Sequence, residues 1–152
     1  MTLKRNEQGF TIIEVVLVLA IAGLIFLMIF IALPALQRGQ RDTGRKNDIS
    51  TVAAAVNSYK SNNKNNISGL GDTEIRNYLD DLSQYETSAV DVSTNGNGFT
   101  AETIRVYLNR KCAPNGQNGS NAVQLVTATR SVAVAGGLEN NGSQVVINCQ
   151  DV

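Results

Sequence analysis

The sequence predicts an α+β protein in which one long N-terminal helix packs on a small antiparallel sheet. Three observations lead to this fold class. An uncharged apolar run extends from Val15 to Leu36, an apolar stripe at helical spacing follows it, and alternating runs bounded by Gly and Asn fill the last third of the chain. With 152 residues, the chain has room for one modest folded domain beside such a helix.

The predicted helix extends from Phe10 to Ser61 and has two different halves. Residues 10–36 are apolar on all sides, and this segment exceeds the roughly 20 residues that cross a lipid bilayer. Residues 37–61 form an amphipathic continuation, because apolar side chains recur there at intervals of three and four. The side chains of this predicted buried stripe are Ile49, Val52, Ala53, Val56 and Tyr59.

Three residues are expected to weaken the helix where its two halves join. Pro34 lacks a backbone N–H, and Gly39 and Gly44 each cost about 1 kcal/mol of helix stability relative to alanine. A simple kink is one consequence that this weakness would have.

Residues 62–152 are predicted to form a globular head. A short helix is expected from Asp72 or Thr73 to Tyr85, with Ile75, Leu79 and Leu82 as its buried edge. Loops are expected at 93–98, 114–120 and 140–142. Strands are expected at 103–108, 123–129, 130–135 and 144–149, connected as an antiparallel meander. The alternation leaves open whether 123–135 is one strand or two.

Composition argues against several functions. The chain has 13 basic and 13 acidic residues and no histidine, so it offers neither a strong field for nucleic acid nor the commonest catalytic base. We therefore expect no enzyme activity, no cofactor and no nucleic-acid partner. The basic segment Arg38, Arg41, Arg45 and Lys46 is more typical of a solvated helix face than of a DNA-binding patch. No metal site is expected, because the aspartates lack the spacing of a calcium loop.

The two cysteines, Cys112 and Cys149, predict a disulfide if this part of the chain is exported. The bridge would tie down the C-terminus of the head. A reactive thiol is the alternative, and the lack of histidine disfavours it.

The N-terminal residues carry the most specific signal. Lys4 and Arg5 favour a cytoplasmic N-terminus, and a carboxylate, Glu14, stands at the head of the apolar run, where it is unfavourable. The segment from Gly9 and Phe10 to Glu14 resembles the signature of type IV prepilins. That resemblance implies a leader at residues 1–9, cleavage by a prepilin peptidase between Gly9 and Phe10, and N-methylation of Phe10.

The resemblance also implies a function. Such subunits polymerise with copies of themselves into an extracellular filament for adhesion, motility or DNA uptake, with help from a membrane platform protein and a cytoplasmic ATPase. Glu14 would be an assembly residue that pairs with the amine of Phe10 in its own or an adjacent subunit. A glutamate that only reaches toward the lipid headgroups is the alternative.

The sequence departs from the family at one position, because Ile31 stands where a proline is common and Pro34 follows three residues later. The family's behaviour implies that residues 33–44 could lose helix on assembly. Two alternative functions stay open: a type II secretion pseudopilin and a single-span, membrane-anchored extracellular binding protein. An exported enzyme is disfavoured, because the sequence contains no catalytic constellation.

Overall fold

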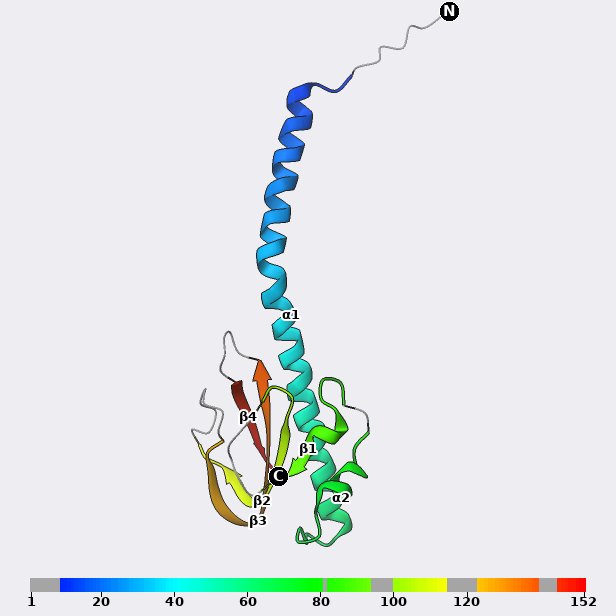
Figure 1. The fold of residues 1–152 in the computed structure, drawn as a ribbon, viewed down its shortest axis with the longest axis vertical. Coiled ribbons are helices and arrows are strands. Elements are labelled where there is room, and N and C mark those ends of the chain that lie inside the picture. Colours follow the sequence, from blue (N-terminus) through cyan, green and yellow to red (C-terminus); the bar gives the residue numbers. More distant parts are fainter. Residues whose placement is uncertain (1–8, 81, 94–99, 115–122, 140–144) are drawn as a thin grey trace, which may run out of the picture. The chain divides into compact units, whose positions relative to one another are not determined.

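The computed structural model describes residues 9–80, 82–93, 100–114, 123–139 and 145–152 (Figure 1). Its elements, in chain order, are α1 (Ile12–Asn62), α2 (Asp72–Arg76), the 3₁₀ turn η1 (Thr87–Ala89), β1 (Val90–Val92), β2 (Ile104–Cys112), β3 (Leu125–Glu139) and β4 (Val145–Asp151). This order confirms the predicted α+β class. The chain divides into two compact units, one up to Gln37 and a C-terminal unit from Arg38 to Val152.

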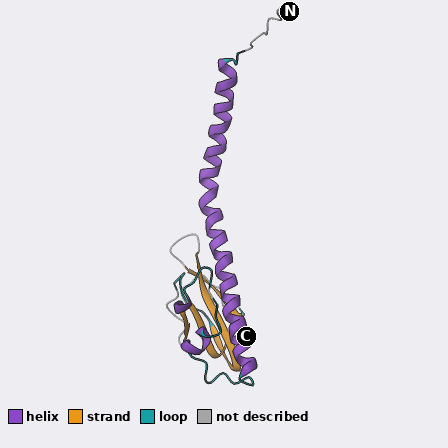
Figure 2. Cartoon of the chain, turned by 90° about the vertical axis from the view of Figure 1, so that its right-hand side faces the viewer, coloured by secondary structure: helices purple, strands orange, loops and turns teal. Residues whose placement is uncertain are grey.

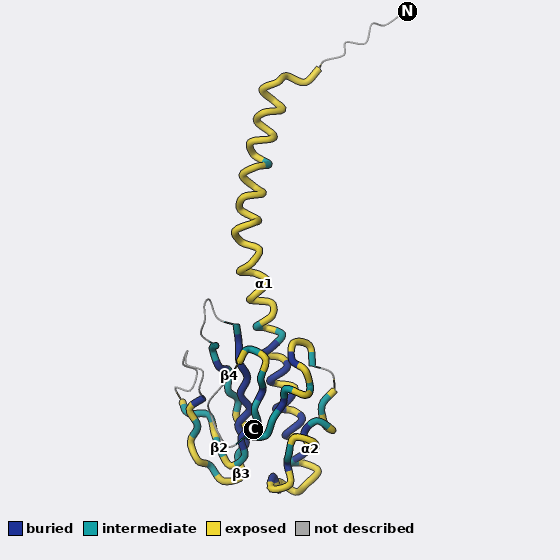
Figure 3. Tube along the Cα trace, viewed as in Figure 1, coloured by how far each residue is buried: buried dark blue, intermediate teal, exposed yellow. Residues whose placement is uncertain are grey.

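Helix α1 begins and ends close to the predicted positions and continues through Pro34. Up to Gln37 its side chains are exposed, with Ala22 alone half-buried (Figure 3). From Arg45 onward one face is buried, and the predicted stripe is confirmed. Its buried residues are Arg45, Asp48, Ile49, Val52, Ala53, Ala55, Val56 and Tyr59.

The sheet has the strand order β1-β2-β3-β4. The pairs β2–β3 and β3–β4 are antiparallel, which confirms the predicted meander. Strand β1 was not predicted, and it pairs with β2 in parallel, with Val90 opposite Ile104. The sheet is therefore mixed rather than purely antiparallel. Three residues are too few for alternation to be recognised in a sequence.

The core of the C-terminal unit has two parts, because alternate residues of a strand point to opposite faces. On one face, Val106, Val132 and Val134 belong to the cluster that includes Ile49 and Val56 of α1, and all five are fully buried. Figure 2 shows the second half of α1 beside the sheet. On the other face, a smaller cluster contains Tyr107, Val123, Ala133, Ala135 and Ile147.

The sequence left open whether 123–135 forms one strand or two. The segment forms one strand, and its pairing with β2 shifts between Leu108, opposite Val132, and Arg110, opposite Thr127. At this bulge Asn109 and Arg130 both have positive φ, at 55° and 60°. The backbone N–H of Arg130 donates to Oδ1 of Asn109 at 3.1 Å, which stabilises the irregular pairing.

The predicted helix from residue 72 to Tyr85 is wrong in length, because α2 ends at Arg76. Residues 77–80 and 82–85 lie outside any helix, and the backbone N–H groups of Gln84 and Tyr85 donate to the buried carboxylate of Asp48. This tertiary contact replaces helical hydrogen bonds. The predicted loops at 93–98, 114–120 and 140–142 lie largely outside the described residues.

Candidate assembly site at the start of helix α1

Helix α1 begins with a capping box formed by Thr11 and Glu14. The backbone N–H of Thr11 donates to Oε2 of Glu14 at 2.9 Å, and the Thr11 hydroxyl donates to the same oxygen at 2.7 Å. The backbone N–H of Glu14 in turn reaches Oγ1 of Thr11 at 3.4 Å. These contacts satisfy groups at the first turn that have no partner within the helix. Glu14 thus has an internal partner in the single chain.

The sequence analysis missed this role of Glu14, although the signal was present. Threonine followed three residues later by glutamate, directly before an apolar run, is the sequence pattern of a capping box. The Thr11 partners of this carboxylate could therefore have been predicted from these two residues.

Phe10 and the first turns of α1 present a continuous apolar surface. Phe10 is 89% exposed, and Ile12 and Ile13 are similarly open. A groove of about 510 Å³ follows this surface and is lined by Phe10, Glu14, Val15, Val18 and Leu19. Glu14 is the one charged residue among these five, so the groove has a single carboxylate amid apolar surface.

The apolar part of α1 is long enough to cross a membrane, by its length and composition. None of it is buried within the protein. An exposed apolar surface of this extent is unfavourable in water and needs either lipid or another protein to cover it.

The three predicted helix-weakening residues have different surroundings. Pro34 lies within α1, and a Cβ placed on Gly39 would meet nothing within 4 Å among the described residues. A Cβ on Gly44 would lie 2.7 Å from Cγ of Gln84. Gly44 therefore also makes room for the loop that packs on α1, a role that sequence reasoning did not find.

The basic segment of α1 is largely occupied by internal ion pairs. Arg41 Nη2 lies 2.8 Å from Oε2 of Glu139, and Arg45 Nη2 lies 2.8 Å from Oε1 of the same carboxylate. Arg45 also pairs with Asp42 at 3.5 Å. The hydrogen bond from Arg41, followed by the contacts with Arg45, holds the pKa of Glu139 below its ordinary value. These arginines join the helix to strand β3.

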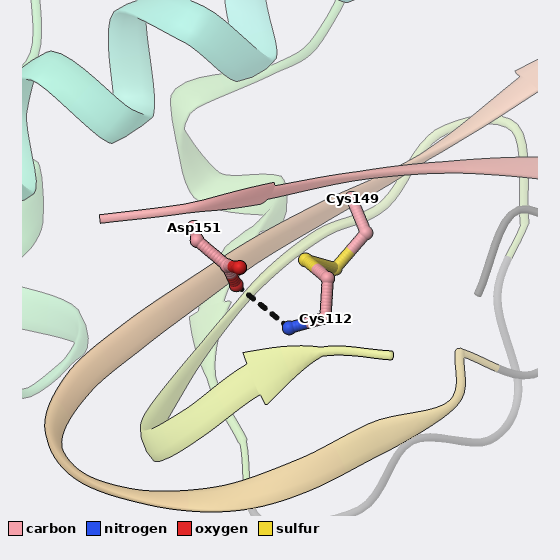
Figure 4. Close-up of a disulfide and its surroundings, with 3 residues drawn as sticks. All are labelled: Cys112, Cys149 and Asp151. Carbon is pink, nitrogen blue, oxygen red and sulfur yellow. Dashed lines mark hydrogen bonds between the residues drawn. A yellow bond between two sulfur atoms is a disulfide. The ribbon is translucent and has the colours of Figure 1, made fainter. Parts of the chain in front are cut away.

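Cys112 and Cys149 form a disulfide with a Cα–Cα distance of 6.0 Å (Figure 4). The bridge connects the end of β2 to β4, which are not neighbours in the sheet. Next to it, the backbone N–H of Cys112 donates to Oδ1 of Asp151 at 2.7 Å. Among the described residues, no three Cys, Asp or Glu side chains gather closely enough to hold a metal ion.

The described chain thus combines an exposed apolar helix, long enough to cross a membrane and with a carboxylate in its first turn, with a disulfide-bonded α+β unit. Residues 4–30 match the family model described as the prokaryotic N-terminal methylation motif. This match supports the assignment of the chain to the type IV pilin and pseudopilin family, with a membrane-anchored precursor. Comparisons with curated proteins and with solved structures gave no significant match.

Proposed function

We propose that this chain is the structural subunit of a type IV pilus. The observation that carries the proposal is the carboxylate of Glu14 at the head of an exposed apolar helix, within the residues that match the methylation motif. A plain membrane anchor gains nothing from a charge at this position, whereas a polymer can use it to set the register between subunits.

Maturation proceeds in the membrane. Lys4 and Arg5 hold the leader, residues 1–9, on the cytoplasmic side, where a prepilin peptidase cleaves between Gly9 and Phe10. The new amine of Phe10 is methylated. The apolar helix, residues 10–36, remains on the mature subunit, and residues 37–152 lie outside the cell.

Assembly transfers the helix from lipid into a filament of identical subunits. The apolar surfaces that lipid covered then cover one another, and Glu14 exchanges its Thr11 partners for the Phe10 amine of an adjacent subunit. In a site of low dielectric, an unpaired carboxylate is costly, so this pairing favours one axial register. A platform protein and a cytoplasmic ATPase supply the work of extraction. The filament serves adhesion, motility or DNA uptake.

Mass spectrometry of sheared extracellular filaments tests the proposal. We expect a mature N-terminus at Phe10 that carries a methyl group. An intact Met1, recovered only from membranes, would contradict the proposal and favour a single-span anchored binding protein. Processed protein that stays in the cell envelope and supports protein secretion would favour a pseudopilin, since the methylation motif serves both classes.

Three variants separate the charge of Glu14 from its capping role. Glu14→Gln removes the charge but keeps a side chain that completes a capping box, whereas Thr11→Ala removes the box and keeps the charge. Glu14→Ala removes both. If the charge sets the register, filament yield falls in both Glu14 variants and persists in Thr11→Ala. Normal yield from Glu14→Gln, with loss in Thr11→Ala, would show that Glu14 serves only as a cap.

A further inference from the structure

A second candidate site lies in the C-terminal unit. A pocket of about 490 Å³ is lined by residues 64–68, in the loop after α1, and by Asn109 and Arg130 at the bulge of the β2–β3 pair. We call it the loop–bulge pocket. Its volume lies within the roughly 300–1,000 Å³ that is usual for small-molecule sites.

The backbone around this pocket is unusual. Lys64, Asn65, Asn109 and Arg130 have φ values of 54°, 64°, 55° and 60°, and these are the non-glycine residues with positive φ in the described part of the chain. All four line the pocket. Lysine and arginine have no intrinsic preference for this conformation, and such conformations gather at ligand-binding sites because the surrounding structure must hold them in place.

The lining is rich in hydrogen-bond donors. Oδ1 of Asn66 accepts hydrogen bonds from the backbone N–H and the hydroxyl of Ser68, at 3.1 and 2.8 Å. Oδ1 of Asn109 accepts the backbone N–H of Arg130. Both carbonyl oxygens are thus occupied, and the two Nδ2 groups have no hydrogen-bond acceptor among the described residues. They are donors available to a ligand.

Two cations complete the lining. The side chains of Lys64 and Arg130 are exposed and form no ion pair with any described residue, and no described Asp or Glu lines the pocket. Ile67 also borders the pocket, but its side chain is buried in the core at 5% exposure. A matching ligand carries a negative charge and several oxygen acceptors.

We propose that the loop–bulge pocket binds an acidic sugar unit, a saccharide that carries a carboxylate or a sulfate. The anion would pair with Lys64 and Arg130, and the ring and hydroxyl oxygens would accept hydrogen bonds from Asn66 and Asn109. An inorganic anion has the charge but lacks the ring and hydroxyl oxygens that this assignment pairs with the asparagines. A neutral sugar leaves both cations unpaired.

The test is titration calorimetry on the full-length protein in detergent micelles. The probes are glucuronic acid, N-acetylglucosamine 6-sulfate, glucose and sodium sulfate. We expect at least one acidic sugar to bind about tenfold or more tightly than glucose and than sulfate, and the stronger of the two identifies the preferred anion. No binding of either acidic sugar at millimolar concentration, or equal binding of glucose or sulfate, would overturn the proposal.

Variants connect binding to this pocket. Arg130→Asn and Lys64→Asn each remove one cation and place at a positive φ a residue that tolerates it. Each should weaken binding about tenfold, because it removes a charge-assisted hydrogen bond. Lys111→Gln removes an exposed cation of β2 outside the pocket and should leave the affinity unchanged. Unchanged affinity in both asparagine variants would contradict the proposal. Circular dichroism confirms that each variant is folded, and unassembled protein keeps the result independent of filament formation.

Discussion

Oδ2 of Asp48 on α1 accepts the backbone N–H of Gln84 at 2.6 Å, and the two residues are 36 positions apart. The same carboxylate accepts the N–H and hydroxyl of Ser83, at 3.0 and 2.8 Å, and the N–H of Tyr85 at 3.2 Å. Asp48 is only 4% exposed. One side chain thus fastens the loop after α2 to the helix.

Replacing Asp48 with asparagine should lower the free energy of unfolding by roughly 2–3 kcal/mol, because an amide NH₂ would then face backbone donors that lose their acceptor. Denaturant unfolding in detergent, followed by circular dichroism, measures the change. Asp80→Asn, at an exposed carboxylate, is the matched control and should change stability little. A loss in Asp80→Asn equal to that in Asp48→Asn would contradict a specific role for Asp48.

Glu139 predicts an acid-dependent loss of stability. Its pKa is held below the ordinary value of 4.5, first by the hydrogen bond from Arg41 and then by the contacts with Arg45. A carboxyl group whose pKa is lower in the folded state stabilises fully above its unfolded pKa, and the contribution disappears as the pH falls through the folded pKa. Stability should therefore decrease below about pH 4.5.

Glu139→Gln should remove part of this acid dependence and lower stability at neutral pH. Melting temperatures measured between pH 3 and pH 7 check both effects, at roughly one-unit steps. Glu86→Gln, at an exposed carboxylate without an ion pair among the described residues, is the control and should lower the melting temperature at neutral pH less than Glu139→Gln does. If the melting temperature of Glu139→Gln depends on pH as steeply as that of the parent protein, other carboxylates determine the acid sensitivity.

Gly137 of β3 should not tolerate a side chain. A Cβ at this position would collide with the backbone carbonyl oxygen of Thr100, and a backbone atom moves less easily than a side chain. Gly137→Ala should therefore destabilise the C-terminal unit by about 1–3 kcal/mol. Thermal melting measures the loss, and a melting temperature equal to that of the parent would mean that the segment at Thr100 yields without cost.

Reducing the disulfide should lower the free energy of unfolding by about 4 kcal/mol. The sequence separation of 37 residues defines the loop, and the entropy of closing such a loop in the unfolded chain gives this magnitude. Unfolding with and without reductant measures it. The double variant Cys112→Ser and Cys149→Ser should have the free energy of unfolding of the reduced protein, and reductant should not change it. Equal stability with and without reductant would contradict this prediction.

Residues 33–44, where the two halves of α1 join, should influence the yield of filaments. If residues 33–44 must lose helix in the filament, Pro34→Ala and Gly39→Ala should each reduce filament yield while they strengthen α1. Gly39 suits this test because its Cβ would meet no described residue. Filament yield after shearing gives the measurement. Undiminished yield from both variants would indicate that the segment stays helical in the filament.

Periodicity explains which parts of the fold were predictable. The stripe from Ile49 to Tyr59 and the alternation of β2 reflect burial against a core, and burial leaves a regular pattern in the sequence. The end of α2 and the position of β1 leave no such pattern. Arg76 donates to the carbonyl of Val90 at 3.1 Å, and Asp72 accepts the N–H of Val92 at 2.6 Å, so contacts between separate segments hold β1 in place.

The two candidate sites also differ in how far the sequence could predict them. The resemblance around Gly9, Phe10 and Glu14 depends on neighbouring residues, and the family model matches the same region. The loop–bulge pocket joins residues 64–68 to Arg130, which no spacing rule connects.

The sequence by itself determined the apolar helix, the processing signature and the α+β class, since each depends on the order and period of nearby residues. Only the tertiary structure decided the partners of buried and charged groups that lie far apart in the sequence: Asp48 with the loop at Gln84, and Glu139 with Arg41 and Arg45. The physical reason is that a polar group removed from water takes whichever partner folding brings within about 3 Å.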